Sequence, residues 1–546
     1  MNDSTLSRAR LVELLWQLKQ QLDSSGGTGD IRFVHFNTLL NDPAYRAEVI
    51  RHAASSSVND VRTIGMKLVE MNERDGSLLS GALHRPASMG GERADDPSAS
   101  TTSDKQSRTG GLPVMAILLL AVVGAAGYGG WLYYQDLKQA LSGVQIVSGV
   151  ISENQHWQKG VDIKLRGLVF VESGAQLTID PGVQVLGQPG SALIVTRGAK
   201  LLARGTADQP IVFTSAQSVG LRNRGDWGGI VLLGSGLVNR GNAHIEGVDA
   251  SDPRGAFGGN DVAHNCGILE YVRVEFAGFE ISKDNELNGL TLGGCGSDTI
   301  VRFVQVHRGK DDGIELFGGN ANLQNVVITG VADDSLDWDM GWRGNVQFLI
   351  AQQHNDVGDS AFEGDSNKAD HDAEPRSAPT IYNATLISPR SRARLQRAMT
   401  IRSGSVGRFN NFIVSGFSGE LIDLRGASTA RLAAEGDVTI KGLITHTVAN
   451  FEDELGDADD DNGLIEKEWL LIQGSGLQLN QDPALPRSAR DSTNPSFVPA
   501  RNSPAMSGGQ RPPQGEFWDE SATWLGAVKP GSIATWLDGW TSFPAN

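Results

Sequence analysis

The residues with the clearest capacity for chemistry are acidic side chains that recur at equivalent places in a repeated segment. Asp312 begins the segment Asp-Gly-Ile-Glu-Leu, and Asp334 begins Asp-Ser-Leu-Asp-Trp 22 residues later. Glu315 and Asp337 share the fourth position, and Asp311 immediately precedes the first segment. If the segments are neighbouring parallel strands, equivalent carboxylates stack about 4.8 Å apart. They then repel one another unless a proton, a cation or an arginine relieves the repulsion.

Three interpretations of this acidic ladder stay open. Aspartates at tight corners accept hydrogen bonds from backbone N–H groups. Clustered carboxylates also bind Ca²⁺, the one cofactor that the sequence suggests. A carboxylate pair can finally act as general acid and base, as in glycoside hydrolysis. The candidate catalytic residues are then Asp311, Asp312, Asp334, Glu315 and Asp337.

The acidic segments belong to a longer repeat that predicts the fold. Further copies begin at Asn288 and Asp359, so the leading residues are 24, 22 and 25 positions apart. Short strands that repeat at such a period predict a solenoid whose coils bury their apolar residues by stacking. We expect an all-β, right-handed parallel β-helix over residues 145–450. The expected inward columns are Leu290, Ile314 and Leu336, and then Leu292, Leu316 and Trp338.

Two other acidic runs are candidate metal sites. The run from Asp457 to Glu468 resembles an EF-hand loop, except that its glycine stands at position 7 instead of 6. A solvated acidic loop explains the same run. A second run places acidic residues beside His371. The alternative is that this run is an exposed polar insertion that binds no metal. The candidate ligands in the two runs are Asp457, Asp459, Asp461 and Glu468, and then Asp370 and Asp372.

The rest of the chain divides into segments of different composition. Residues 1–75 predict a small cytoplasmic helical domain. Leu11, Leu14, Leu15 and Leu18 form an apolar stripe in it, and Asp42-Pro43 begins a helix. Residues 76–111, rich in Ser, Gly, Asp and Arg, predict a disordered linker. Residues 451–546 contain the acidic run, a Pro/Ser-rich stretch and a Trp-rich end. We expect that end to cap the last coil.

Residues 112–134 predict one transmembrane helix. These 23 residues carry no charge and are rich in Leu, Ala, Val and Gly, which is long enough to cross a bilayer core of about 30 Å. Lys105 and Arg108 on the N-terminal side favour a cytoplasmic N-terminus. Cys266 and Cys295, 29 residues apart, are either a disulfide between neighbouring coils or two buried thiols.

Composition excludes several function classes. The net charge is −17, and residues 1–111 carry 13 basic and 14 acidic residues, so the acidity belongs to the remainder. An acidic chain is not expected to bind nucleic acid, whose partners are basic. The sequence contains no Walker A loop, HExxH, GxSxG or paired CxxC motif. Nucleotide hydrolysis, zinc proteolysis and serine esterase chemistry are therefore not expected.

A series of longer motifs resembles a known group of proteins. The segments GAQLTIDPGVQV, RGDWGGIVLLG, ILEYVRVEFAGF, NELNGLTLGGCGS and WLDGWTSF occur in one order within residues 145–546. They resemble bacterial β-helix envelope proteins, a group of lipoproteins and hypothetical surface proteins with the pectin-lyase-like fold. The resemblance implies a parallel β-helix outside the cytoplasm and implies no defined activity. The short segment KDDG is also similar to one segment of polygalacturonases.

Together these features predict a single-pass protein of the bacterial inner membrane with its β-helix in the periplasm. We expect a binding or scaffold protein, stabilised by Ca²⁺, whose partner is an envelope protein or polysaccharide. The alternative is a polysaccharide lyase or glycoside hydrolase that uses the acidic ladder. Oligomeric state is left open.

Overall fold

The structure, a computed structural model, describes residues 14–15, 17–18, 21, 43–54, 56, 58–74, 143–241, 243–282, 285–390, 394–449 and 461–546. The chain separates into two compact units, residues 1–117 and 118–546. The predicted linker and the predicted membrane span over residues 112–134 lie outside the described residues. No helix in the described ranges is both long and apolar enough to cross a membrane.

In the described part of the first unit, helix α3 (Pro43–Ala54) packs against helix α4 (Asn59–Arg74). The prediction that Pro43 begins a helix is confirmed. Val49, Ile50 and Val61 are buried between the helices. Gly65 permits this close approach, because a Cβ there would lie 2.5 Å from the backbone nitrogen of Ala54.

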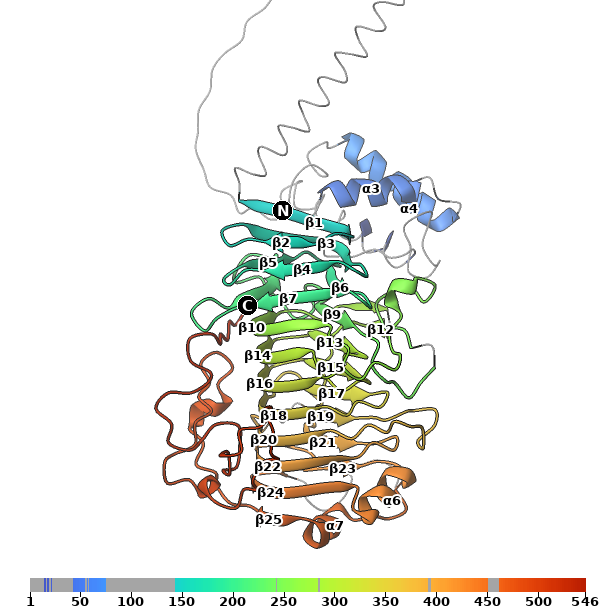
Figure 1. The fold of residues 1–546 in the computed structure, drawn as a ribbon. Helices are drawn as coiled ribbons and strands as arrows, with labels where there is room; N and C mark the ends of the chain where they lie inside the picture. Colours follow the sequence, from blue (N-terminus) through green and yellow to red (C-terminus); the bar gives the residue numbers. More distant parts are fainter. Residues whose placement is uncertain are drawn as a thin grey trace, which may run out of the picture. The chain divides into compact units, whose positions relative to one another are not determined.

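The second unit is a stack of parallel coils (Figure 1). Its first half comprises β1 (Val144–Ile151), β2 (Gln155–Trp157), β3 (Asp162–Val171), β4 (Gln176–Ile179), β5 (Gln184–Gly187), β6 (Ala192–Val195), β7 (Lys200–Arg204), β8 (Ile211–Ser215), β9 (Ile230–Leu233), η1 (Pro253–Gly255), β10 (Gly267–Glu275), β11 (Glu280–Ser282), β12 (Asn285–Glu286), β13 (Leu290–Gly293) and β14 (Ile300–His307).

The second half continues with β15 (Ile314–Phe317), β16 (Asn322–Thr329), β17 (Leu336–Asp339), β18 (Asn345–Gln352), β19 (Ser360–Gly364), β20 (Thr380–Ile387), β21 (Arg397–Ile401), β22 (Gly407–Ser415), β23 (Asp423–Leu424), α6 (Ala427–Glu435), β24 (Val438–His446), α7 (Glu466–Gln473), β25 (Ser475–Gln478), η2 (Arg487–Arg490) and η3 (Pro504–Met506). Each coil contributes a short strand, such as β15, and a longer bent strand, such as β16. The predicted parallel β-helix is confirmed.

The register of the short strands confirms the predicted columns. Leu290 pairs with Ile314, which pairs with Leu336. Leu292, Leu316 and Trp338 form the neighbouring column, and all of these side chains are buried. The register of the fourth copy differs by one residue from the register that Asp359 predicts. Leu336, which is two residues after Asp334, pairs with Phe362, which is two residues after Ser360. Ser360, and not Asp359, is therefore the equivalent of Asp334.

The long strands bend where a residue adopts the left-handed conformation. These positions stack from coil to coil and are Phe303, Asn325, Phe348, Asn383 and Asn411, with φ between 53° and 64°. Asparagine tolerates this conformation better than most residues. The bend turns these side chains to the outside of the coil, where they meet the C-terminal part of the chain.

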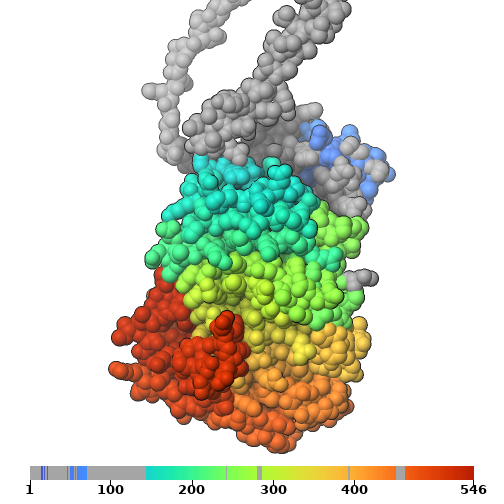
Figure 2. Space-filling model, in the orientation of Figure 1, coloured from blue at the N-terminus to red at the C-terminus, as the bar shows by residue number. Residues whose placement is uncertain are grey.

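Residues 480–546, which we call the C-terminal strap, lie along one flank of the coils (Figures 1 and 2). Asn383 Nδ2 donates a hydrogen bond to the carbonyl of Trp524 at 2.8 Å, and Trp524 stacks on Phe348. Further back along the stack, Trp540 packs edge-on against Tyr271 and Phe303. The chain end lies beside β7 and β10, where the Asn546 carbonyl accepts a hydrogen bond from Gly220 N.

The expectation that the tryptophan-rich end caps the last coil is wrong. Its tryptophans cover the aromatic and amide side chains of the bend positions in earlier coils instead. The last coil is closed by α7, whose Trp469 and Leu470 are buried in the core of the solenoid. Trp469 Nε1 also donates to the carbonyl of Ala433 in α6 at 2.9 Å.

Cys266 and Cys295 form a disulfide with a Cα–Cα distance of 5.8 Å. Of the two alternatives, the disulfide is therefore confirmed. It joins the beginning of β10 to the end of β13, and both sulfur-bearing residues are buried.

Candidate functional site: a buried carboxylate ladder

The acidic ladder lies on the outer side of the short strands β13, β15, β17 and β19. Thr291 pairs with Glu315, Glu315 with Asp337, and Asp337 with Glu363. Alternation along a strand turns these side chains away from the core once Leu290 and its equivalents point inward. The stacking predicted for Glu315 and Asp337 is therefore confirmed.

A long connection between β9 and β10, residues 234–266, covers this outer side. Its Ile245, Val248 and Phe257 form an apolar cluster with Phe317 and Met340. Phe317 is two residues after Glu315, and Met340 is three residues after Asp337. The backbone of the connection is also fixed to the coils, since Asn239 N donates to the carbonyl of Met340 at 3.0 Å. As a result the ladder faces outward from the solenoid and is nevertheless buried.

The leading residues form a second file, in which each side chain binds the next coil. Asn288 Oδ1 accepts a hydrogen bond from Asp312 N at 3.1 Å, and Asp312 Oδ1 accepts one from Asp334 N at 2.9 Å. Asp334 Oδ1 in turn accepts from Ser360 N at 2.6 Å. These bonds support the corner-forming interpretation for one oxygen of each carboxylate.

The carboxylates also gather closely enough to share cations. Oxygens of Asp312, Glu315 and Asp337 lie within 4.8 Å of one another. Two further groups meet the same limit, one of Asp311, Asp312 and Asp333 and one of Asp333, Asp334 and Asp359. Ligands that each lie 2.3–2.6 Å from one Ca²⁺ are separated by at most about 5 Å. The spacing therefore fits a shared hard cation.

Asp337 gives the clearest sign that the first group is electrostatically incomplete. Its side chain is 8% exposed, and its Oδ1 has no hydrogen-bond partner among the described residues. The neighbouring Glu315 does have a donor, the Nδ2 of Asn288. A buried oxygen that is left without a donor is costly, and this one adjoins two further carboxylates.

Burial and mutual repulsion raise the pKa values along the ladder. The pKa values of Asp312, Glu315, Asp334 and Asp337 are all raised well above their usual range, first by burial and then by the neighbouring carboxylates. Burial and Asp333 raise the pKa of Asp311 to about 7. Burial also raises the pKa of Glu363 to about 7, although Arg402 opposes the shift. The group therefore favours bound protons or a bound cation.

Arginines neutralise the ladder at one end only. Arg402 contacts Glu363 and Asp365, and Arg397 lies 3.0 Å from Glu420 and 3.1 Å from Asp359. Asp312 and Asp337 belong to earlier coils. Neither forms an ion pair with an arginine among the described residues. The unbalanced charge is thus concentrated at β15 and β17.

Within the described residues, none of the other predicted metal ligands belongs to a carboxylate group close enough to share a cation. Asp457 and Asp459 lie outside the described residues. Asp461 Oδ1 accepts hydrogen bonds from Gly463 N and Leu464 N, which makes it a turn residue, and Glu468 is exposed on α7. Asp370 and Asp372 are exposed, and Asp372 pairs with Arg376 at 3.2 Å.

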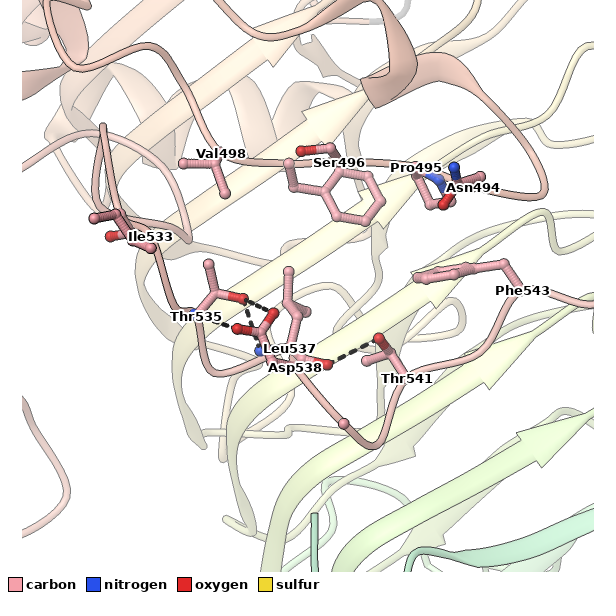
Figure 3. Close-up of a pocket in the computed structure, with 13 residues that line it drawn as sticks. Asn494, Pro495, Ser496, Val498, Ile533, Thr535, Leu537, Asp538, Thr541 and Phe543 are labelled. Atoms are coloured by element: carbon pink, nitrogen blue, oxygen red, sulfur yellow. Dashed lines mark hydrogen bonds between the residues drawn. The ribbon is translucent and has the colours of Figure 1, made fainter. Parts of the chain in front are cut away.

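Two cavities are lined by residues outside the ladder itself. One of about 610 Å³ opens within the C-terminal strap, between residues 494–498 and 532–543 (Figure 3). Its walls include Phe497, Leu537 and Phe543, and its one carboxylate, Asp538, is held by Thr535. Another of about 680 Å³ lies at residues 244–250 in the covering connection. Neither presents a second catalytic set.

Three carboxylates belong to the site that the sequence analysis did not include among its candidates. These are Asp333, Asp359 and Glu363. Asp333 precedes Asp334 as Asp311 precedes Asp312, so its place was visible in the repeat. Glu363 was not predicted, because counting from Asp359 assigns the fourth position of that copy to Phe362 instead of Glu363.

The fold and the ladder define a class, the parallel β-helix proteins that carry acidic residues outside their short strands. A family model for the pectate-lyase-like β-helix domain matches residues 149–477. This match spans more than half of the chain, which therefore belongs to the pectate-lyase-like β-helix family. No curated protein and no solved structure matches the chain significantly.

The raised pKa values predict an unusual pH dependence for the metal-free protein. Asp311 and Glu363 have pKa values of about 7 when folded, compared with about 4 when unfolded. The folded state therefore binds more protons, and its free energy of unfolding should increase as the pH falls from about 8 to about 6.5. Urea unfolding in EDTA, followed by tryptophan fluorescence, measures this change.

The lower limit of that window, pH 6.5, matters because two histidines act in the opposite direction below it. Burial lowers the pKa values of His307 and His354 to about 3, so the stability they contribute is lost as the pH falls below about 6.5. A free energy of unfolding that decreased between pH 8 and 6.5 would contradict the raised carboxylate pKa values.

Proposed function

We propose that this chain is a non-catalytic binding protein whose β-helix is stabilised by Ca²⁺ and presents its flank to an envelope protein or polysaccharide. The observation that carries this proposal is the burial of the ladder. Asp312 is 5% exposed and Asp337 is 8% exposed, beneath the connection of residues 234–266. A polymer cannot reach carboxylates that are covered in this way, whereas a cation that binds during folding can.

The donor set supports Ca²⁺ as the cation. Ca²⁺ is a hard ion that prefers carboxylate, carbonyl and amide oxygens. Asp312, Glu315 and Asp337 would hold it. Asp337 Oδ1, which has no hydrogen-bond partner among the described residues, would then coordinate the cation. A bound cation would offset the repulsion within the group and would join β15 to β17. Its role in the proposal is therefore structural.

Replacing Asp337 with asparagine tests the cation. Asp337→Asn should stabilise the metal-free protein at pH 8 by about 1–3 kcal/mol, because it removes a buried charge from among like charges. Ca²⁺ at 100 times its dissociation constant should stabilise the wild type by about 2.7 kcal/mol and should have little effect on the variant. Thermal and urea unfolding with Ca²⁺ or EDTA provide the measurement.

The matched control is Asp298→Asn, which removes an exposed aspartate from the turn between β13 and β14. It should leave both the metal-free stability and the response to Ca²⁺ unchanged. Equal stabilisation of the wild type and Asp337→Asn by Ca²⁺ would exclude this group as the site.

A polysaccharide lyase or hydrolase is the second candidate, and one observation favours it. Asp333 is the exposed member of the acidic groups, and Asp311 beside it is half-buried. Burial and Asp333 raise the pKa of Asp311 to about 7, so a fraction of Asp311 is protonated at neutral pH. A protonated carboxyl beside an ionised one is the arrangement that acid–base catalysis uses.

A cleavage assay separates the two candidates. The full chain should release no new chain ends from acidic or neutral bacterial and plant polysaccharides, with or without Ca²⁺, because the buried carboxylates are inaccessible. Asp312→Asn should instead lower stability or Ca²⁺ affinity. Cleavage that disappears in Asp312→Asn or Asp333→Asn, in variants that unfold at the wild-type temperature, would establish an enzyme.

The proposal also includes a location. The predicted span at residues 112–134 would anchor the chain in an inner membrane, with residues 1–75 in the cytoplasm and the solenoid in the periplasm. The Cys266–Cys295 disulfide supports an oxidising compartment for the solenoid.

Membrane fractionation tests this location. The full chain should remain with membranes after a high-salt or alkaline wash, and deletion of residues 112–134 should release it, because the span supplies the apolar anchor. A reporter that is active only outside the cytoplasm should be active when it follows residue 546 and inactive when it precedes residue 1. The reverse pattern would invert the orientation.

A further inference from the structure

A second polar cluster lies just after the C-terminal ends of the long strands, and it has the opposite charge from the ladder. It consists of Arg308, which follows β14, His354, which follows β18, and Arg224 from the connection between β8 and β9. Among the described residues, Asp356 is the one carboxylate that pairs with it, through Arg224 at 3.0 Å, and the Asp356 side chain is 64% exposed. Two guanidinium groups thus adjoin one solvated carboxylate in a protein that is otherwise acidic.

Arg224 holds the cluster together. Its Nε donates to the carbonyl of Gly330 at 2.6 Å, and one terminal nitrogen lies 3.4 Å from Nδ1 of His354. The His354 ring in turn lies directly against Gly330, where a Cβ would come within 2.2 Å of Nδ1. The imidazole is therefore fixed between the coil and a guanidinium.

This arrangement determines which His354 nitrogen carries the proton. Burial and the positive charges of Arg308 and Arg224 lower the pKa of His354 to about 3, so the ring is neutral at pH 7. A guanidinium can only donate, so Nδ1 must accept from Arg224. The single proton is then on Nε2, which is buried and has no partner among the described residues.

Arg308 presents a second unused donor. Its Nε is buried and has no hydrogen-bond partner in the described part of the chain. Burial and the charge of Arg224 both lower its pKa, which places the two guanidinium groups close together. Among the described residues, the two buried donors Arg308 Nε and His354 Nε2 therefore have no acceptor, although two positive charges adjoin them.

The neighbouring His307 shows how such a ring is normally satisfied. Its Nδ1 lies 2.7 Å from the hydroxyl of Thr329, and its Nε2 lies 2.8 Å from the carbonyl of Pro544 in the C-terminal strap. His307 and His354 are 6.2 Å apart, centroid to centroid. The missing acceptor at His354 is therefore a local property of this cluster.

We propose that Arg308, Arg224 and the Nε2–H of His354 form a binding site for an oxyanion, either a free inorganic anion or the acidic group of a larger ligand. Sulfate, phosphate and carboxylate oxygens accept charge-assisted hydrogen bonds from arginine in the geometry that a guanidinium offers. The site is independent of the carboxylate ladder and of Ca²⁺.

Isothermal titration of the full chain tests the site. Sodium sulfate and sodium glucuronate are titrated separately in EDTA at constant ionic strength, with chloride as the balancing anion and glucose as the neutral counterpart of glucuronate. Either anion should bind saturably, and Arg308→Gln should weaken that binding by about tenfold or more, because it removes a charged donor. Arg308→Lys, which keeps the charge, should have a smaller effect.

Arg204→Gln, at an exposed arginine that ends β7, is the matched control and should bind as the wild type does. Tighter binding of glucuronate than of sulfate would identify the acidic group of a larger ligand as the source, and the reverse would identify a free anion. No saturable binding of either, or equal affinities for Arg308→Gln and Arg204→Gln, would overturn the proposal. Thermal unfolding of each variant without ligand confirms that it is folded.

Discussion

Parallel stacking places each residue directly over its equivalent in the next coil, about 4.8 Å away. For Leu290, Ile314 and Leu336 this contact is favourable, because it removes apolar surface from water in a continuous column. The same geometry applies to Glu315 and Asp337, whose charges repel at that distance. The constraint that forms the core therefore also creates the electrostatic problem at the outer side.

The chain meets this problem differently in different coils. Backbone N–H groups stabilise one oxygen each of Asp312 and Asp334. Arg402 and Arg397 neutralise the carboxylates around β19 and β21. At β15 and β17 neither solution is complete, because Asp337 Oδ1 is buried and finds no hydrogen-bond partner in the part of the chain that the structure describes. The covering connection of residues 234–266 intensifies the repulsion by excluding water, which is why a proton or a cation is favoured there.

The fold could be predicted from the sequence because its determinant is local and repeated. Steps of 24 and 22 residues with an apolar column are enough to establish the register of the first three copies, and the equivalence of Glu315 and Asp337 follows from it. The burial of the ladder could not be predicted, because the connection that covers it has no period of its own. The prediction that the tryptophans of the C-terminal strap cap the last coil was wrong for a related reason. An aromatic cluster indicates burial without indicating which surface, and here the surface is the file of bend positions that includes Phe303 and Phe348.

The turn after β14 explains how one solenoid can keep opposite charges apart. Arg308 and Asp311 are three residues from each other, and both adopt the left-handed conformation, with φ of 53° and 58°. Two such residues fold the turn tightly, and the strands on either side are each held in the stack. Arg308 therefore joins Arg224 and His354, whereas Asp311 joins Asp312 and Asp333. A flexible turn would allow these charges to pair. The rigid coil prevents this, and so a cluster of arginines and a cluster of carboxylates can coexist at the two ends of the same short turn.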